Sequence, residues 1–140
     1  VMDMGTGTGI LAILAVMLGA KEVEAVEIDP FAYENAVVNA DLNNVKIDRI
    51  ILGDAKSLAE VSGVDIFLAN INRNIIISDL PAYAVTLNDG ASVMLSGFYE
   101  EDIPMIVEAA RPLGLEFADS MTLDRWASLH LIYNSKSREK

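Results

Sequence analysis

Hydrophobic and polar residues follow two alternating patterns along the chain. Short runs of β-branched and aliphatic residues, typical of buried strands, are separated by longer stretches in which apolar residues have helical spacing. The predicted strands cover residues 1–4, 23–28, 49–52, 65–69, 91–96, 115–121 and 126–133. The predicted helices cover residues 10–18, 30–43, 73–88 and 103–113. Strands separated by helices imply right-handed crossover connections and a parallel sheet with helices on both faces.

The last two predicted strands break this alternation, because only a few residues join them. So short a link permits only an antiparallel pair. The expected fold class is therefore α/β, with a doubly wound, Rossmann-like sheet that is mostly parallel and carries an antiparallel hairpin at its C-terminal edge.

Local signals refine the predicted boundaries. Asp29 followed by Pro30 is typical of a helix N-cap with proline at the first helical position. Pro81 is expected to break the helix over residues 73–88. Asparagine, aspartate and glycine at residues 88–90 indicate a turn.

The composition suits one folded domain. The 140 residues are 52% hydrophobic and 22% charged, with a mean hydropathy of +0.34. This is enough apolar material for a sizeable core and argues against disorder. The first predicted strand begins at Val1 with no turn or element before it. We therefore expect residues 1–140 to form one domain that has been clipped on its N-terminal side.

Charge and composition exclude several function classes. The 21 acidic and 10 basic residues give a formal charge of −11, which disfavours direct nucleic-acid binding and suits cationic partners such as a basic protein. With no cysteine and one histidine, neither a metal site nor a thiol nucleophile is expected. The longest apolar run, residues 10–18, has nine residues and is too short to span a membrane. A cytoplasmic location is expected.

A glycine-rich run follows the first predicted strand and opens the first helix: Asp3-Met4-Gly5-Thr6-Gly7-Thr8-Gly9. Open α/β sheets bind ligands at this place, where glycines let the backbone approach a ligand and the helix start offers unpaired N–H groups. The third glycine of a dinucleotide fingerprint would stand at position 10, which is Ile10. No lysine follows before Lys21, so a nucleoside triphosphate is also disfavoured.

Carboxylates follow the next two predicted strands. Glu27 ends the second strand beside the glycine loop, where a carboxylate can accept both hydroxyls of a ribose. The alternative is a solvated strand end, and the neighbouring loop favours the ribose role. Asp54 follows the third strand and either accepts an adenine amino group or belongs to a turn. Helix capping is sufficient to explain Asp29.

Several blocks occur in order along the chain: Asp3-x-Gly5-x-Gly7-x-Gly9, Glu27-x-Asp29-Pro30, Asn39-Ala40-Asp41-Leu42-Asn43, Gly53-Asp54, Ala69-Asn70-Ile71 and Leu95-Ser96-Gly97-Phe98. Together they resemble class I S-adenosylmethionine-dependent methyltransferases. Within that class they are similar to the methyltransferases of the eleventh protein of the large ribosomal subunit. The resemblance implies that residues 1–140 are a catalytic domain.

The resemblance also implies cofactor contacts, at Asp3, Gly5, Thr6, Gly7, Glu27, Ile28, Asp54 and Asn70. In the family the glycine loop packs against the methionine part of S-adenosylmethionine, and Asp3 lies near its ammonium group. Glu27 holds the ribose and Asp54 meets the adenine. Ile28 packs on the adenine face, although a place in the core explains this aliphatic residue equally well.

Asn70 is the predicted catalytic residue. It ends the fourth strand beside the glycine loop, where its carboxamide can accept a hydrogen bond from a neutral amine and aim the nitrogen lone pair. The resemblance implies that Asn70 lies beside the transferable methyl group. Other amino-group methyltransferases have an Asn-Pro-Pro-aromatic motif here, and the two prolines are missing. Asn72 and Arg73 either cap the next helix or touch the substrate.

We therefore predict an S-adenosylmethionine-dependent N-methyltransferase that acts on amines of a basic protein, a large-subunit ribosomal protein. Two alternatives stay open. One is a methyltransferase for a small molecule or another macromolecule on the same scaffold. The other is a cofactor-binding module without turnover.

Overall fold

A computed structural model describes residues 1–139, in which seven strands form one sheet of order β3-β2-β1-β4-β5-β7-β6. The strands are β1 (Met2–Met4), β2 (Glu24–Glu27), β3 (Arg49–Leu52), β4 (Val64–Asn70), β5 (Leu87–Tyr99), β6 (Leu113–Leu123) and β7 (Trp126–Arg138). The helices are α1 (Ile10–Met17), α2 (Pro30–Leu42), α3 (Arg73–Ala84) and α4 (Ile103–Ala110), with 3₁₀ turns η1 (Ala55–Glu60) and η2 (Glu100–Asp102).

The strand directions confirm the predicted fold class. β1 to β5 are parallel, whereas β7 is antiparallel to both β5 and β6. The hairpin of β6 and β7 forms the C-terminal edge of the sheet, with β6 outermost. The sheet is thus mostly parallel and Rossmann-like.

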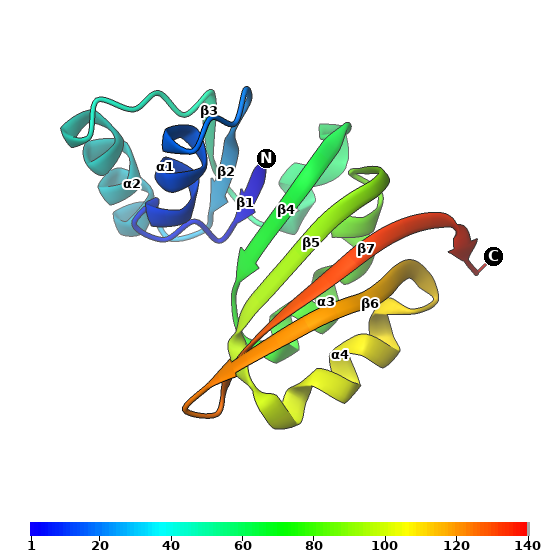
Figure 1. Cartoon of the computed structure of the whole chain (residues 1–140). Coiled ribbons are helices and arrows are strands. Elements are labelled where there is room, and N and C mark those ends of the chain that lie inside the picture. Colours follow the sequence, from blue (N-terminus) through cyan, green and yellow to red (C-terminus); the bar gives the residue numbers. More distant parts are fainter. Residues whose placement is uncertain (140) are drawn as a thin grey trace.

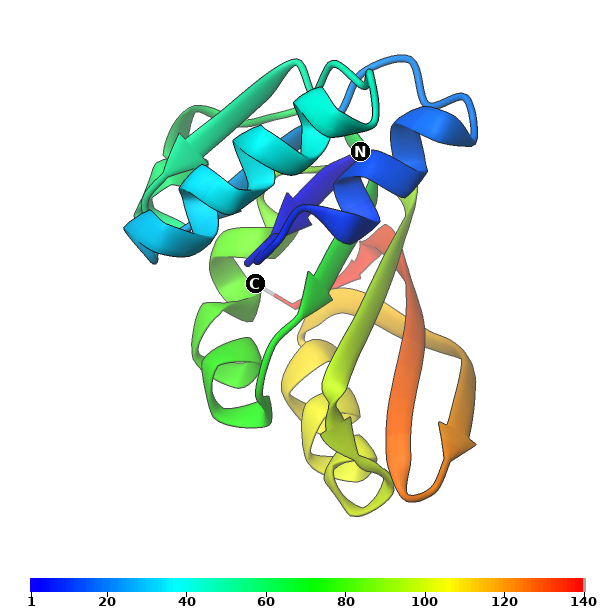
Figure 2. The same cartoon turned by 90° about the vertical axis from the view of Figure 1, so that its left-hand side faces the viewer.

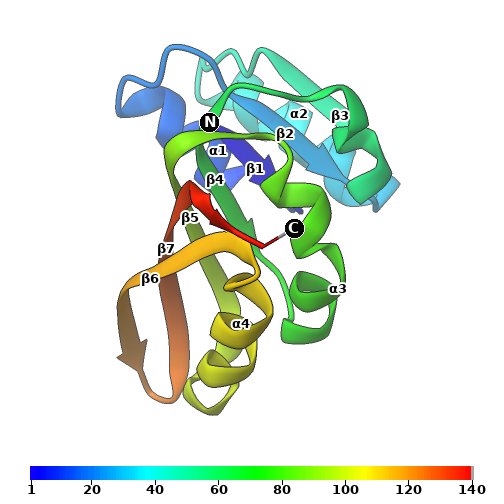
Figure 3. The same ribbon diagram turned by 90° about the vertical axis from the view of Figure 1, so that its right-hand side faces the viewer.

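The helices cover the sheet in two separate groups (Figures 1 and 3). α1 and α2 pack beside β1 to β3 (Figure 2). A small core in this region contains Ala12, Ile13, Ala25 and Ala40. α3 and α4 lie against the opposite face of β4 to β7. The larger core forms there around Phe67, Val93, Leu95, Ile76, Leu80 and Ile106, each less than 2% exposed. Burying each such side chain contributes about 1.5–3 kcal/mol to the free energy of unfolding.

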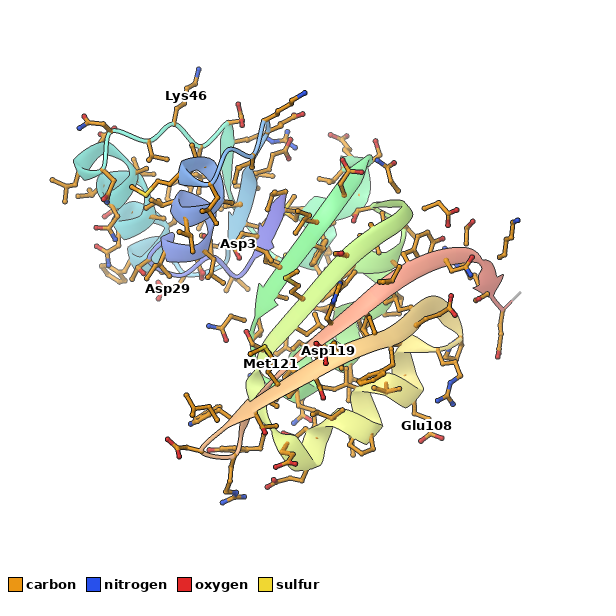
Figure 4. All side chains as sticks on the ribbon, in the orientation of Figure 1. Asp3, Asp29, Lys46, Glu108, Asp119 and Met121 are labelled. Carbon is orange, nitrogen blue, oxygen red and sulfur yellow. The ribbon has the colours of Figure 1, made fainter. Side chains whose placement is uncertain are left out.

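The face of β5, β7 and β6 that is turned toward the viewer in Figure 1 carries none of the helices formed by residues 1–139. The pairing register puts Met94, His130 and Asp119 in one row on this face. Met121 lies further along β6 and is 71% exposed (Figure 4). Asn70, the last residue of β4, belongs to the same face. It pairs with Ser96, which lies two residues beyond Met94 and therefore on the same side of β5.

Two predicted boundaries are wrong. Pro81 lies inside α3 rather than breaking it, because its exposed position is one turn from the helix end and buried Tyr83 and Ala84 hold that last turn on the sheet. Residues 88–90 are the start of β5 rather than a turn. There Asn88 Nδ2 donates to Asp65 Oδ1 at 2.9 Å, which ties the segment to β4.

The helix predicted over residues 103–113 ends at Ala110, and β6 begins at Leu113. The predicted cap of α2 is confirmed, since Phe31 N–H donates to Asp29 Oδ1 at 2.9 Å and Pro30 follows directly. None of the helices within residues 1–139 is long and apolar enough to cross a membrane.

Candidate functional site

The carboxyl ends of three adjacent parallel strands define the candidate site. β1 lies between β2 and β4, so the glycine loop after β1, Glu27 at the end of β2 and Asn70 at the end of β4 meet at one edge of the sheet. Ligands of open α/β sheets bind at this edge. The structure therefore brings together the residues at the centre of the sequence-based prediction.

The glycine loop folds back onto the end of β2. The N–H groups of Gly5 and Thr6 both donate to the carbonyl oxygen of Val26, at 2.8 and 3.0 Å. A Cβ atom at Gly7 would meet nothing within 4 Å, so the outer side of the loop is open space. The loop is therefore hydrogen-bonded to β2 on one side and is open at Gly7 on the other.

The Glu27 side chain connects two segments at this edge of the sheet. Its carboxylate is buried, with the residue 8% exposed. It accepts hydrogen bonds from Gly7 N–H at 2.8 Å on Oε1 and from Asp29 N–H at 2.9 Å on Oε2. An ionised carboxylate has about four acceptor positions, so each oxygen keeps one for a further donor. The side chain joins the glycine loop to the start of α2 and is not a solvated strand end.

Asp3 lies beneath the loop and anchors it. The residue is 1% exposed, and Thr6 Oγ1 donates to its Oδ2 at 2.7 Å. Burial raises the pKa of the Asp3 carboxyl, the Thr6 hydrogen bond opposes this rise, and the nearby charge of Glu27 adds to it. A cation brought beside Asp3 would favour its ionised form. Asp3 and Thr6 thus shape the loop from inside.

The two predicted adenine contacts lie further out. Ile28 is 68% exposed, so the alternative that places it in the core is wrong. Asp54 is exposed and caps η1, since Lys56 N–H donates to its Oδ1 at 2.9 Å, which fits its reading as a turn aspartate. Gly53 N–H donates to the Glu27 carbonyl oxygen at 2.8 Å. The segment that carries Asp54 therefore adjoins the end of β2.

Asn70 ends β4, and its side chain lies against β5. Ile71 N–H donates to the Ser96 carbonyl oxygen at 2.9 Å, which extends the β4 and β5 pairing by one step. Asn72 caps α3, because Ile75 N–H donates to its Oδ1 at 3.0 Å, so the capping alternative holds for Asn72. Arg73 does not cap the helix and instead pairs with Asp102, with Nη1 and Oδ1 2.8 Å apart.

Sequence reasoning missed the part that Asp102, just after the end of β5, plays beside the site. Asp102 is 8% exposed and accepts from Tyr99 N–H at 3.0 Å as well as from Arg73. The ring of Tyr99 stacks on Trp126, with centroids 4.5 Å apart. The acidic run from Glu100 to Asp102 is visible in the sequence, but nothing there indicates that Asp102 is buried.

Two cavities are lined mainly by other residues, although Thr8 of the glycine loop lines the second. One, of about 370 Å³, is at the amino-terminal ends of β1, β2 and β4, the opposite edge of the sheet. The other, of about 470 Å³, is lined by Ile13 and Met17 of α1 and Asn39 of α2. Neither includes a predicted site residue. Within residues 1–139, no three His, Asp or Glu side chains are grouped so as to hold a metal ion.

The chain is similar to known proteins over almost its whole length. Residues 1–133 match the family model described as ribosomal protein L11 methyltransferase (PrmA). A ribosomal protein L11 methyltransferase from Porphyromonas gingivalis is 45% identical over 138 residues, which are 99% of this chain and 48% of that protein. The chain thus spans about half the length of the curated relatives it matches.

Solved structures agree. A ribosomal protein L11 methylase from Lactobacillus delbrueckii subsp. bulgaricus superposes with a TM-score of 0.83 at 34% identity, over 99% of this chain and 69% of that one. M. jannaschii TYW2, solved in complex with AdoMet, has a TM-score of 0.71 at 22% identity, over 94% and 66% of the two chains, and shows the fold alone. The resemblance found in the sequence is confirmed, and the chain belongs to the ribosomal protein L11 methyltransferase (PrmA) family.

Proposed function

We propose that residues 1–140 are the catalytic domain of an S-adenosylmethionine-dependent N-methyltransferase that methylates amines of ribosomal protein L11. The observation that carries this proposal is the Glu27 carboxylate, which is oriented by Gly7 N–H and Asp29 N–H at the tip of β2. One strand, β1, lies between β2 and β4, so the glycine loop after β1 lies between Glu27 and Asn70 at this edge of the sheet. The proposal therefore assigns donor binding and amine orientation to adjacent strand ends.

The residues present suit S-adenosylmethionine. Glu27 keeps one acceptor position on each oxygen for the two ribose hydroxyls, and the open side of Gly7 leaves room for a ligand against the loop. Asp3, buried beneath the loop, supplies negative charge toward the methionine ammonium. We assign the remaining contacts to Gly5 and Thr6 in the loop. Ile28 and Asp54, at the outer strand tips, are assigned to the adenine.

Asn70 orients the acceptor in this proposal. When bound, the cofactor supplies a methyl group on a positively charged sulfur. The Asn70 carboxamide oxygen accepts a hydrogen bond from the neutral amine of the substrate and fixes the direction of its lone pair. Holding reacting atoms in line at about 3–3.5 Å contributes up to about 7–11 kcal/mol in model reactions. Positioning by Asn70 is the main catalytic contribution that we assign to this chain.

Charge supports a basic protein as the substrate. The formal charge of −11 creates a field that attracts lysine-rich surfaces and repels nucleic acid. Ribosomal protein L11 is the substrate named for the curated relatives. Because ribosomal proteins are made in the cytoplasm, we also assign the activity to that compartment.

A two-stage experiment tests the proposal. Isothermal titration of the chain with S-adenosylmethionine measures donor binding, and isotope-labelled methyl transfer to purified ribosomal protein L11, followed by mass spectrometry, measures turnover. We expect binding and label on amine nitrogens. Failure to bind would refute the cofactor assignment. Binding without transfer to L11 or to any protein of a ribosomal extract would favour the module without turnover.

A further inference from the structure

Gly97 forms a bulge in β5 directly against Asn70. The pairing of β5 with β7 shifts register between Ser96 and Phe98, and the residue between them, Gly97, has φ +96°. On the other side, Ser96 pairs with Asn70 and accepts a hydrogen bond from Ile71 N–H. The bulge therefore faces the last residue of β4 and the first residue after it.

No side chain fits at this position. A Cβ atom built on Gly97 would lie 2.8 Å from Asn70 Oδ1, 2.7 Å from the Ile71 carbonyl oxygen and 2.9 Å from Ile71 N. Two of these three atoms belong to the backbone and cannot rotate away. By contrast, a Cβ atom on Gly5 would lie 2.9 Å from Ile71 Cδ1, the far end of a flexible side chain. The contact at Gly97 is therefore the stricter one.

We propose that Gly97 is a positioning residue for Asn70. Its bare Cα lets the segment of Asn70 and Ile71 lie directly over the β5 bulge, and this close approach sets where the carboxamide oxygen points. A methyl group at position 97 would push the segment away from β5 and turn Asn70 out of line. The inference rests on the proposed function for its catalytic consequence, but the contact itself does not.

Positive φ gives a simpler reason for glycine at position 97, since L-residues are strained there. Gly90 is a matched control for this explanation. It lies in the same strand with φ +83°, and a Cβ atom there would meet nothing within 4 Å. Gly90→Ala therefore reproduces the backbone strain without the contact. Any effect of Gly97→Ala beyond that of Gly90→Ala reports on Asn70 and Ile71.

The first readout is independent of catalysis. In ¹⁵N-labelled chain, the side-chain amide resonances of Asn70 are assigned by their loss in Asn70→Ser. We expect Gly97→Ala to shift them and Gly90→Ala to leave them in place. In the methyl-transfer assay we expect Gly97→Ala to lower kcat by about 10²-fold, with the S-adenosylmethionine Kd within about twofold of the parent and Gly90→Ala unchanged in both.

Thermal unfolding supplies a second test, which also serves if Gly97→Ala folds poorly. If the contact is real, Gly97→Ala lowers Tm less in an Asn70→Ser background than in the parent, because the shorter side chain relieves part of the collision. Equal losses in the two backgrounds, or Asn70 resonances that do not move, would overturn the inference. A parent chain that methylates nothing would refute the proposed function and leave both of these readouts intact.

Discussion

Arg73 Nη1 donates to Asp102 Oδ1 at 2.8 Å, and this pair joins the segment after β4 to the segment after β5. Asp102 also accepts from Tyr99 N–H at 3.0 Å. Together with the hydrogen bond from Ile71 N–H to Ser96, these contacts hold the loop that begins at Asn70 at both of its ends.

The Asp102 contacts predict a pH dependence of stability. The Tyr99 N–H and the Arg73 guanidinium hold the pKa of Asp102 below its usual value. A lowered pKa in the folded state stabilises the fold above the unfolded pKa of about 3.9 and is lost as the pH falls through the folded value. We expect the stability advantage of the parent over Asp102→Asn, measured by urea unfolding, to shrink below about pH 4. Asp124→Asn, in the exposed β6–β7 turn, is the control. An advantage that does not change with pH would contradict the assignment.

The buried carboxyl of Asp3 predicts the opposite pH dependence of stability. Burial raises its pKa in the folded state, so the ionised form costs free energy as the pH rises above about 3.9. We expect the free energy of unfolding of Asp3→Asn to gain on that of the parent as the pH is raised from about 4 to about 7. The exposed Asp41→Asn in α2 should track the parent throughout. If the free energy of unfolding of Asp3→Asn instead gained on that of the parent as the pH is lowered, Asp3 would have a cationic partner in the free protein.

Removing the Glu27 carboxylate should weaken donor binding. Glu27→Ala deletes the acceptors proposed for the ribose and also leaves Gly7 N–H and Asp29 N–H without their partner. We expect S-adenosylmethionine to bind more weakly, with a binding free energy less favourable by about 1–3 kcal/mol in titration calorimetry. Glu24→Ala, in the same strand but at its far end, should bind normally. Equal affinity of the Glu27 variant and the parent would remove the ribose role.

Asn70→Ala should separate turnover from binding. The proposed role of Asn70 is to orient the amine, so we expect kcat for methyl transfer to fall by about 10²-fold while the Kd of S-adenosylmethionine changes little. Single-turnover kinetics with labelled donor measure both quantities. Asn35→Ala, exposed on α2, is the control. Comparable losses of turnover and donor affinity would show that Asn70 holds the donor instead.

Local chemistry explains which parts of the fold the sequence could predict. The bounds of β3 and the cap at Asp29 depend on neighbouring residues and were predicted correctly. The start of β5 was not, because its residues look like a turn in isolation. Asn88 bonds to Asp65, and Asp89 accepts from Ser135 N–H, partners 23 and 46 residues away. Such tertiary partners override a local turn signal.

Only some of the site residues could be predicted from the sequence. The glycine loop, Glu27 and Asn70 could be placed because the carboxyl ends of parallel strands meet at one sheet edge. Gly97 and Asp102 could not, since one acts through a bulge in β5 and the other through an ion pair with α3. Neither a bulge nor the burial of one carboxylate in a run of three acidic residues is encoded in residue spacing.

Ile71 lies between the two halves of the site, with its side chain against Gly5 and its backbone against Gly97. The glycine loop and the Asn70 segment therefore share one contact residue. Any cooperativity that this contact transmits is reciprocal: the factor by which the methyl donor tightens binding of the amine must equal the factor by which the amine tightens binding of the donor.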